Sequence, residues 1–232
     1  MKAPRDSLRC SIEQRIGYRF RNVELFETAI SHRSWCNGKV DATSNERLEF
    51  LGDAVLSLVV ADYMYRRWPD LHEGPLAKMR SDVVSEPPLA QIALDLGLDG
   101  VVKLGKGEIA SGGRSKPSIL SDTLEALIGA IYLDCEFGTL STVYNIIVEW
   151  LEERLEEASE IPGMLDYKGR FQELVQKQAG ALPVYTVEGE GPEHARHFHA
   201  RVYVSGKLRG SGDGRSKKDA EQMAAKMALR NW

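Results

Sequence analysis

The sequence has little that would indicate an extracellular or membrane-bound protein. Its three cysteines (Cys10, Cys36 and Cys135) are far apart, odd in number and without the spacing of zinc ligands. This argues against a disulfide scaffold or zinc module and fits a reducing cytosol. A run of about 18 apolar residues, as a membrane-spanning helix needs, is missing, and residues 1–20 lack the apolar centre of a signal peptide. We therefore expect a cytoplasmic protein with no membrane partner.

The net charge of −4 over 232 residues would by itself argue against a nucleic-acid partner. The charge is, however, unevenly distributed along the chain. Residues 164–232 contain 12 basic and 8 acidic residues, whereas residues 1–163 contain 18 basic and 26 acidic residues. Such a difference between the two parts predicts two domains with different electrostatic roles.

The pattern of residues predicts where these domains meet. Residues 143–155 have helical spacing and end in acidic turns, and Pro162-Gly163 then stops a helix. We predict an all-α domain over residues 1–155, a linker over 156–165 and a second domain over 166–232. Within the first domain, the glycine-rich stretch 97–113 predicts a loop or short irregular structure.

The second domain is expected to have an α+β fold. Residues 167–178 and 216–229 have helical patterns, and residues 184–188, 197–204 and 207–211 are typical of short strands separated by glycine and proline. The order α-β-β-β-α predicts a small antiparallel sheet with both helices on one face.

One predicted helix, over residues 45–56 and beyond, carries three carboxylates on one face. At about 100° per residue, Glu46, Glu49 and Asp53 fall within roughly 60° of each other. The opposite face is expected in the core and consists of Leu48, Leu51, Val55, Leu58 and Val59. Taken alone, the acidic face is equally consistent with simple exposure to water.

A second predicted helix, over residues 121–133, is apolar nearly all round and should be central and buried. Asp122 and Glu125 share one of its faces, where a carboxylate is costly unless it is paired or bound to a metal. Together the two helices favour one site for hard divalent cations, and carboxylate oxygens suit Mg²⁺. Such a site performs phosphoryl chemistry.

Four further features of this domain leave alternatives open. Phe50 falls on the acidic side of its helix, where it is either a partner contact or a locally buried residue. Glu73 is a weaker addition to the acidic set. The segment His32-Arg33-Ser34 is either part of a polar site or an ordinary helix end, and Lys116 either contacts phosphates or lies in a solvated loop.

In the second domain, Ser216 and Asp219 have the spacing of a capping box at a helix start. Lys217 and Lys218 then lie in the first turn, where the helix dipole disfavours cations unless an anion binds there. This predicts a phosphate site, with two solvated lysines as the alternative. Three side chains of the first helix of this domain could contact an RNA minor groove: Gln172, Glu173 and Gln176. A turn places His194 at the surface of the same domain.

These motifs resemble bacterial ribonuclease III over nearly the whole chain. Residues 45–56, NERLEFLGDAVL, are similar to the signature of that family, and residues 121–130, SDTLEALIGA, are similar to its second acidic motif. Residues 166–232 resemble a double-stranded RNA-binding domain, with GRSKKDAE at 214–221.

The resemblance implies roles for individual residues. The metal-ligand set would be Glu49, Asp53, Asp122 and Glu125, with Asp53 and Glu125 as the catalytic pair, and Glu46 and Glu73 would support metal or substrate binding. Phe50 would insert into a second subunit. Ser216, Lys217 and Lys218 would contact phosphates, and Gln172, Glu173 and His194 would contact the minor groove. Gly169 departs from the pattern, because some relatives have a hydroxyl residue there.

The resemblance further implies a homodimeric, Mg²⁺-dependent endoribonuclease in which Mn²⁺ can substitute and no small-molecule cofactor is used. Its products would carry 5′-phosphate and 3′-hydroxyl ends with a short 3′ overhang, and its substrates would be structured precursors such as ribosomal RNA. The alternative is a catalytically silent scaffold that binds double-stranded RNA. A phosphohydrolase of small nucleotides would leave the basic domain unexplained.

Overall fold

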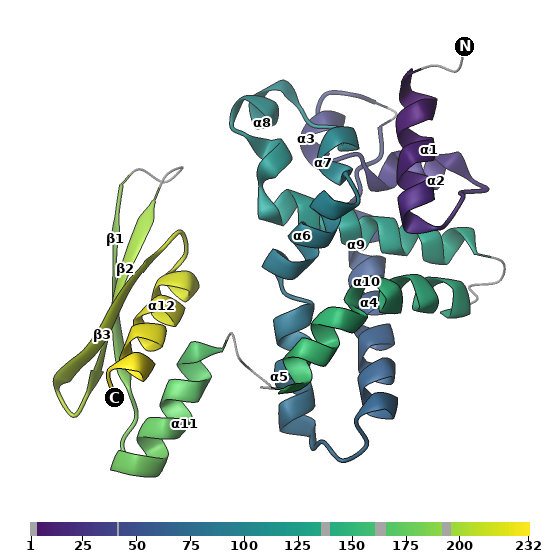
Figure 1. The fold of residues 1–232 in the computed structure, drawn as a ribbon. Coiled ribbons are helices and arrows are strands. Elements are labelled where there is room, and N and C mark those ends of the chain that lie inside the picture. The colour runs from purple at the N-terminus through teal and green to yellow at the C-terminus, as the bar shows by residue number, and fades with distance from the viewer. Residues whose placement is uncertain (1–3, 41, 136–139, 161–165, 192–195) are drawn as a thin grey trace. The chain divides into compact units, whose positions relative to one another are not determined.

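The computed structural model describes residues 4–40, 42–135, 140–160, 166–191 and 196–232 (Figure 1). The chain divides into two units, Met1–Glu160 and Ile161–Trp232. Within the described residues, none of the helices is both long and apolar enough to cross a membrane.

The first unit is helical, as predicted, and its elements follow one another with short connections. They are α1 (Pro4–Ile16), α2 (Val23–Ala29), α3 (Arg33–Cys36), α4 (Glu46–Arg67), α5 (Glu73–Val83), α6 (Glu86–Asp95), α7 (Leu98–Val101), α8 (Lys106–Ala110), η1 (Gly113–Ser115), α9 (Pro117–Asp134) and α10 (Leu140–Glu160). The glycine-rich stretch is thus more ordered than expected, because it contains α7 and α8 and the start of η1.

Helix α9 is the centre of this unit. It runs across the middle of the unit, where α4 crosses it (Figure 1). Most of its side chains are buried, Leu124, Leu127 and Ile128 among them, so the prediction of a central helix is confirmed. On α4, Leu48, Val55 and Val59 are buried as expected, but Leu58 is 56% exposed, so its prediction as a core residue was wrong.

Two glycines allow α4 and α9 to cross at very short range. A Cβ atom on Gly52 would lie 1.7 Å from the carbonyl oxygen of Glu125, and one on Gly129 would lie 2.3 Å from the carbonyl oxygen of Leu48. A larger residue at either position would therefore push the two backbones apart. The crossing places Glu49, which lies between Leu48 and Gly52, beside the turn of α9 that carries Glu125.

Helix α10 extends to Glu160, five residues beyond the predicted end at Leu155. Residues 156–160, expected in the linker, are therefore helical, and residues 161–165 lie outside the described part of the chain. The helix continues because Leu155 is buried and Glu156 accepts a hydrogen bond from Nε of Arg67 on α4 at 2.9 Å. The acidic composition of this segment had suggested a solvated linker.

The second unit contains α11 (Tyr167–Ala179), β1 (Val184–Glu190), β2 (His197–Val204), β3 (Lys207–Gly214) and α12 (Lys217–Arg230). The strands form an antiparallel sheet in the order β1-β2-β3, which confirms the predicted α-β-β-β-α arrangement. Its core joins Phe171 of α11, Ala200 and Val202 of β2, and four alanines of α12, Ala220, Ala224, Ala225 and Ala228. Strands β1 and β3 are two and three residues longer than predicted, because β2 pairs with them along its whole length.

Candidate active site

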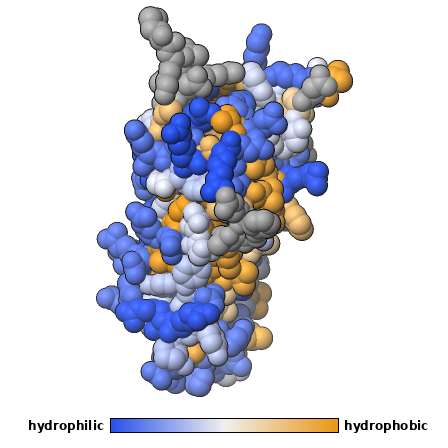
Figure 2. Space-filling model, turned by 90° about the vertical axis from the view of Figure 1, so that its right-hand side faces the viewer, coloured by the Kyte–Doolittle hydropathy of each residue, from blue (hydrophilic) through white to orange (hydrophobic). Residues whose placement is uncertain are grey.

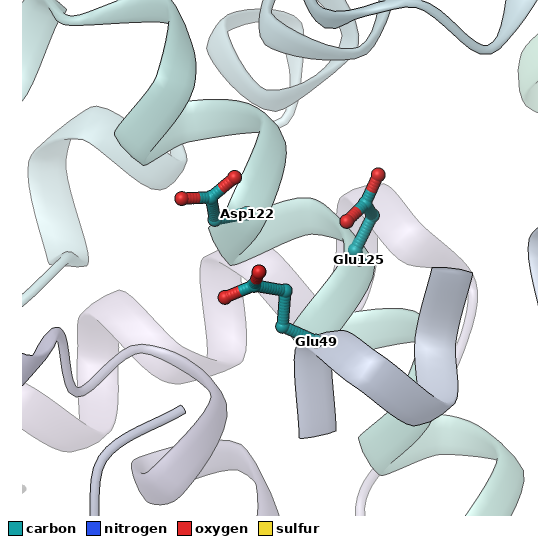
Figure 3. Close-up of side chains that lie close together, drawn as sticks. All are labelled: Glu49, Asp122 and Glu125. Carbon is teal, nitrogen blue, oxygen red and sulfur yellow. The ribbon is translucent and has the colours of Figure 1, made fainter. Parts of the chain in front are cut away.

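Three of the predicted carboxylates converge where α4 crosses α9. Glu49 reaches from α4 towards Asp122 and Glu125 on α9, and each offers an oxygen that lies within 4.8 Å of the others (Figure 3). All three side chains are partly buried. We refer to Glu49, Asp122 and Glu125 as the carboxylate trio.

The trio has no directly paired cationic side chain in the described part of the chain, although the charge of Arg33 acts on Glu49 and Asp122. In the described part of the chain, none of its members forms an ion pair with Lys, Arg or His. Nη1 of the nearby Arg33 lies 3.9 Å from Oε1 of Glu46, whose Oε2 accepts a hydrogen bond from Oγ of Ser44 at 2.7 Å. Glu46 thus interacts with Arg33 and Ser44, and it lines the same pocket as Glu49 and Asp122.

Burial, together with repulsion between carboxylates, raises the pKa values of the trio. Burial, followed by the charges of Asp53, Asp122 and Glu49, raises the pKa of Glu125 from 4.5 to about 7. Burial and the charge of Asp122 raise the pKa of Glu49, and burial raises the pKa of Asp122. Bringing these groups together costs free energy that a bound divalent cation would recover, so the donor set fits such an ion.

Asp53 and Glu73 lie outside the trio. Asp53 is exposed on the next turn of α4, and its charge acts more strongly on Glu125 than that of any other residue. Glu73 is in the first turn of α5 and lines a different pocket, with Met64, Tyr65 and Trp68. The structure therefore places Asp53 at the edge of the site and does not bring Glu73 to it within one protomer.

A polar pocket adjoins the trio and contains residues that the sequence pattern did not single out. Its volume is about 400 Å³, and it is lined by Glu49 and Asp122 of the trio together with His32, Arg33, Asn45, Glu46, Glu108, Lys116, Ser118 and Ile119. Lys116 pairs with Glu108, and burial lowers the pKa of His32. Asn45 immediately precedes the acidic face of α4, and this position in the sequence is the signal from which its place in the pocket could have been predicted.

The second unit presents its predicted phosphate site at the start of α12. Ser216 caps this helix, because its Oγ accepts a hydrogen bond from the backbone N–H of Asp219 at 3.1 Å. Lys217 and Lys218 are exposed in the first turn, and neither forms an ion pair within the described residues. Both cations are thus available to an anion.

The predicted minor-groove residues are only partly covered by the structure. Gln172, Glu173 and Gln176 are exposed on α11, whereas His194 lies outside the described residues. The departure at Gly169 has a structural explanation. Its N–H donates to Oδ1 of Asp166 at 3.0 Å, and a Cβ atom there would lie 2.1 Å from Oδ2 of the same carboxylate. A hydroxyl residue would require the side chain of Asp166 to move.

Comparison with known proteins agrees with this geometry. Residues 22–151 match the family model described as Ribonuclease-III-like, and residues 167–231 match the double-stranded RNA binding motif. The chain belongs to the ribonuclease III family. It is 48% identical over 205 residues to Ribonuclease 3 of Thermobifida fusca, which covers 88% of this chain and 84% of that protein.

Other members of the ribonuclease III family are similar over comparable lengths. Ribonuclease 3 of Caldanaerobacter subterraneus is 44% identical over 222 residues, covering 94% of this chain and 95% of that protein. The solved nuclease domain of ribonuclease III from Campylobacter jejuni, described with a flexible region involved in dimer formation, is 39% identical, with a TM-score of 0.57. The match covers 62% of this chain and 96% of the Campylobacter jejuni chain.

Proposed function

We propose that this member of the ribonuclease III family is an endoribonuclease that hydrolyses phosphodiester bonds in double-stranded RNA with the help of Mg²⁺, or of Mn²⁺ in its place. The observation that carries this proposal is the convergence of Glu49, Asp122 and Glu125 in a chain that also contains a double-stranded RNA binding motif. The products would have 5′-phosphate and 3′-hydroxyl ends with a short 3′ overhang. Structured precursors in the cytoplasm, including those of ribosomal and messenger RNA, would be the substrates.

The catalytic chemistry is assigned to the acidic site. Glu49, Asp122 and Glu125 would hold the divalent cation, with Asp53 completing the set and Glu46 and Glu73 in support. When bound, the cation would supply an activated water and stabilise charge on the leaving 3′-oxygen. Glu125, whose pKa is about 7, is partly protonated near neutral pH and would have to lose that proton to hold the ion. The partial burial of the trio keeps these carboxylates from being fully solvated.

Binding of the duplex is assigned to the second unit. Lys217 and Lys218, next to the free N–H groups at the start of α12, would bind phosphates together with Ser216. Gln172, Glu173, Gln176 and His194 would contact the minor groove, where recognition depends on A-form shape more than on sequence. The acidic first unit then needs to contribute little to the affinity for the duplex.

A double substitution tests this assignment. Lys217→Ala/Lys218→Ala is expected to weaken binding of a long RNA duplex about tenfold or more and to reduce the slope of log affinity against log salt by about 2. Affinity is measured by filter binding across a salt series with a chelator present, so that the duplex stays intact. Lys207→Ala is the matched control, because Lys207 is exposed at the opposite end of β3 from Ser216. An unchanged salt slope in the double variant would contradict the assignment.

We further propose a homodimer formed through α4. Phe50 is 81% exposed, and Leu58 and Tyr65 on the same helix are 56% and 75% exposed. Tyr65 also lines an apolar pocket with Met64, Trp68 and Leu76. Figure 2 shows apolar surface gathered between hydrophilic areas on one side of the protein. Large apolar side chains exposed on one helix beside an apolar pocket are typical of a protein interface.

Phe50→Ala is expected to shift the protein from dimer to monomer at micromolar concentration without changing its fold, because this side chain makes few contacts within its own chain. Sedimentation velocity across a dilution series measures the change. Leu208→Ala, which removes an apolar side chain that is 55% exposed in the second unit, is the control and should remain dimeric. A wild-type protein that sediments as a monomer would contradict the proposed dimer.

A further inference from the structure

Asn45 has a buried side-chain amide that does not make the hydrogen bond usual for asparagine at its position. It occupies the position before α4, where asparagine commonly caps a helix, yet its side chain makes no capping hydrogen bond. The residue is 2% exposed, and its Nδ2, which is itself buried, has no hydrogen-bond partner among the described residues. Buried donors without a partner are rare in folded proteins, and an unmade hydrogen bond at such a group is costly.

The backbone holds this amide in place. The N–H of Asn45 donates to the carbonyl oxygen of Ser31 at 2.9 Å, and its own carbonyl oxygen accepts from the N–H groups of Leu48 and Glu49, each at 2.9 Å. The last bond ties Asn45 directly to a member of the carboxylate trio. The side chain also lines the polar pocket that adjoins the trio.

His32 lines the same pocket, and its hydrogen bonds determine which ring nitrogen carries the proton. Its Nδ1 accepts a hydrogen bond from the backbone N–H of Ser34 at 3.3 Å and lies 2.8 Å from Oγ of Ser34. That Oγ accepts from the N–H of Gly105 at 2.9 Å, so its own hydrogen is free to point at Nδ1. A nitrogen that accepts cannot carry the proton, which therefore resides on Nε2.

The pocket combines two neutral donors with acidic groups and with two cationic side chains, Arg33 and Lys116. Nδ2 of Asn45 and Nε2 of His32 belong to residues that line the pocket together with Glu49 and Asp122, and the buried Nδ2 has to turn towards the pocket to meet a ligand. A cationic side chain in their place would pair with the carboxylates and compete with a divalent ion. Neutral donors instead can bind an acceptor oxygen that enters from outside without neutralising the trio. Phosphodiester oxygens are the acceptors that every nucleotide of an RNA strand presents.

We propose that Asn45 and His32 form a donor pair that binds a phosphodiester oxygen of the strand being cut and so positions that strand beside the carboxylate trio. This inference rests on the proposed function, because it requires an RNA strand at the acidic site. It adds to that function two positioning residues in the first unit, separate from the phosphate site at α12. Their contribution should appear in the rate of cleavage rather than in duplex affinity, which the second unit supplies.

The test compares Asn45→Ala, Asn45→Asp, His32→Ala and His32→Gln in single-turnover cleavage of a long RNA duplex with Mg²⁺. Asn45→Ala and His32→Ala should each lower the maximal rate about tenfold, as expected for one lost hydrogen bond to a charged group, with the half-saturating concentration changed less than about twofold. Asn45→Asp keeps the shape but replaces the donor with an anion, so its loss should be larger. His32→Gln can place an N–H near the position of Nε2 and should recover part of the rate.

Asn22→Ala is the matched control. Asn22 also precedes a helix, but its side chain caps α2 by accepting from the N–H of Glu24 at 3.0 Å, and its removal should leave the rate unchanged. Thermal unfolding and titration with Mg²⁺ accompany each variant. The inference is overturned if folded Asn45 variants cut at the wild-type rate, or if their rate falls only because Mg²⁺ affinity falls. A wild-type protein that binds the duplex and does not cut it would overturn the proposed function as well.

Discussion

Glu125→Gln is expected to lower the rate of duplex cleavage about a hundredfold or more while leaving affinity for the duplex unchanged. The substitution keeps the shape of the side chain but removes the charge from the most strongly perturbed member of the carboxylate trio. Loss of one group that stabilises developing charge costs about 10²–10³-fold in rate. Single-turnover cleavage and filter binding measure the two quantities. Glu149→Gln, the same change at an exposed position of α10, should cut at the wild-type rate.

The same variant shows whether the loss is chemical or structural. Because the pKa of Glu125 is about 7 in the folded protein and near 4.5 when unfolded, the folded protein holds a proton that the unfolded chain releases between these values. The free energy of unfolding of the metal-free wild type should therefore fall as the pH rises through this window. Glu125→Gln removes that loss, and should be more stable than the wild type at pH 8 by about 1–2 kcal/mol after allowance for solvent screening.

Urea unfolding in the presence of a chelator at pH 5 and at pH 8 measures this difference. The two proteins should differ little at pH 5, where Glu125 is largely protonated in the fold. A variant that is less stable than the wild type at pH 8 would show that its loss of activity is a loss of structure. It would also contradict the unfavourable burial and repulsion described for the trio.

Gly52→Ala is expected to destabilise the first unit by about 3 kcal/mol or more and to abolish cleavage. Its Cβ atom would lie 1.7 Å from the carbonyl oxygen of Glu125 and 2.6 Å from the carbonyl carbon, both backbone atoms of the central helix. Since these atoms cannot rotate away, α4 and α9 would have to separate, and overpacking of a well-packed contact typically costs 1–3 kcal/mol or more. Thermal unfolding and the cleavage rate measure the two effects.

Gly74→Ala provides the comparison for this substitution. Gly74 lies in α5, and a Cβ atom there would meet nothing within 4 Å. Alanine should stabilise that helix by about 0.5–1 kcal/mol relative to glycine, with cleavage unchanged. If Gly52→Ala unfolds at the wild-type temperature and still cuts the duplex, the close crossing does not determine the geometry of the site.

The carboxylates could be predicted from the sequence because helical periodicity places them on defined faces. Glu49 on one helix and Asp122 and Glu125 on another follow from spacing and from the apolar surroundings of the second helix. Their convergence could not be predicted in this way. It depends on a contact between Gly52 and α9, which are far apart in sequence, and a glycine carries no periodic signal of its own.

Other differences between prediction and structure also arise from long-range contacts. The acidic end of α10 resembled a linker, but Arg67 of α4 pairs with Glu156 and keeps the segment helical. Leu58 satisfied the apolar spacing of α4 but is exposed, since the same helix must also present an outward apolar surface with Phe50 and Tyr65. The unpartnered side chain of Asn45 could not be predicted, because an asparagine before a helix ordinarily caps that helix.

The second unit was predicted more closely because its signals are local. Glycine and proline separate the strands, and Ser216 caps α12 as its spacing to Asp219 predicts. The strand ends were less accurate, because β1 and β3 continue for as long as β2 pairs with them. Pairing of this kind is set by the partner strand rather than by the residues at the strand end.

Incubation of wild-type protein with a long RNA duplex and Mg²⁺, followed by analysis of the product ends, tests the central claim most directly. The account predicts that the duplex is cut to fragments with 5′-phosphate and 3′-hydroxyl ends, that a chelator stops the reaction, and that the single strand of the same sequence is spared. A duplex that is bound but remains uncut with both Mg²⁺ and Mn²⁺ would contradict the account and indicate an RNA-binding scaffold. Hydrolysis of free nucleotides in place of the duplex would contradict it equally.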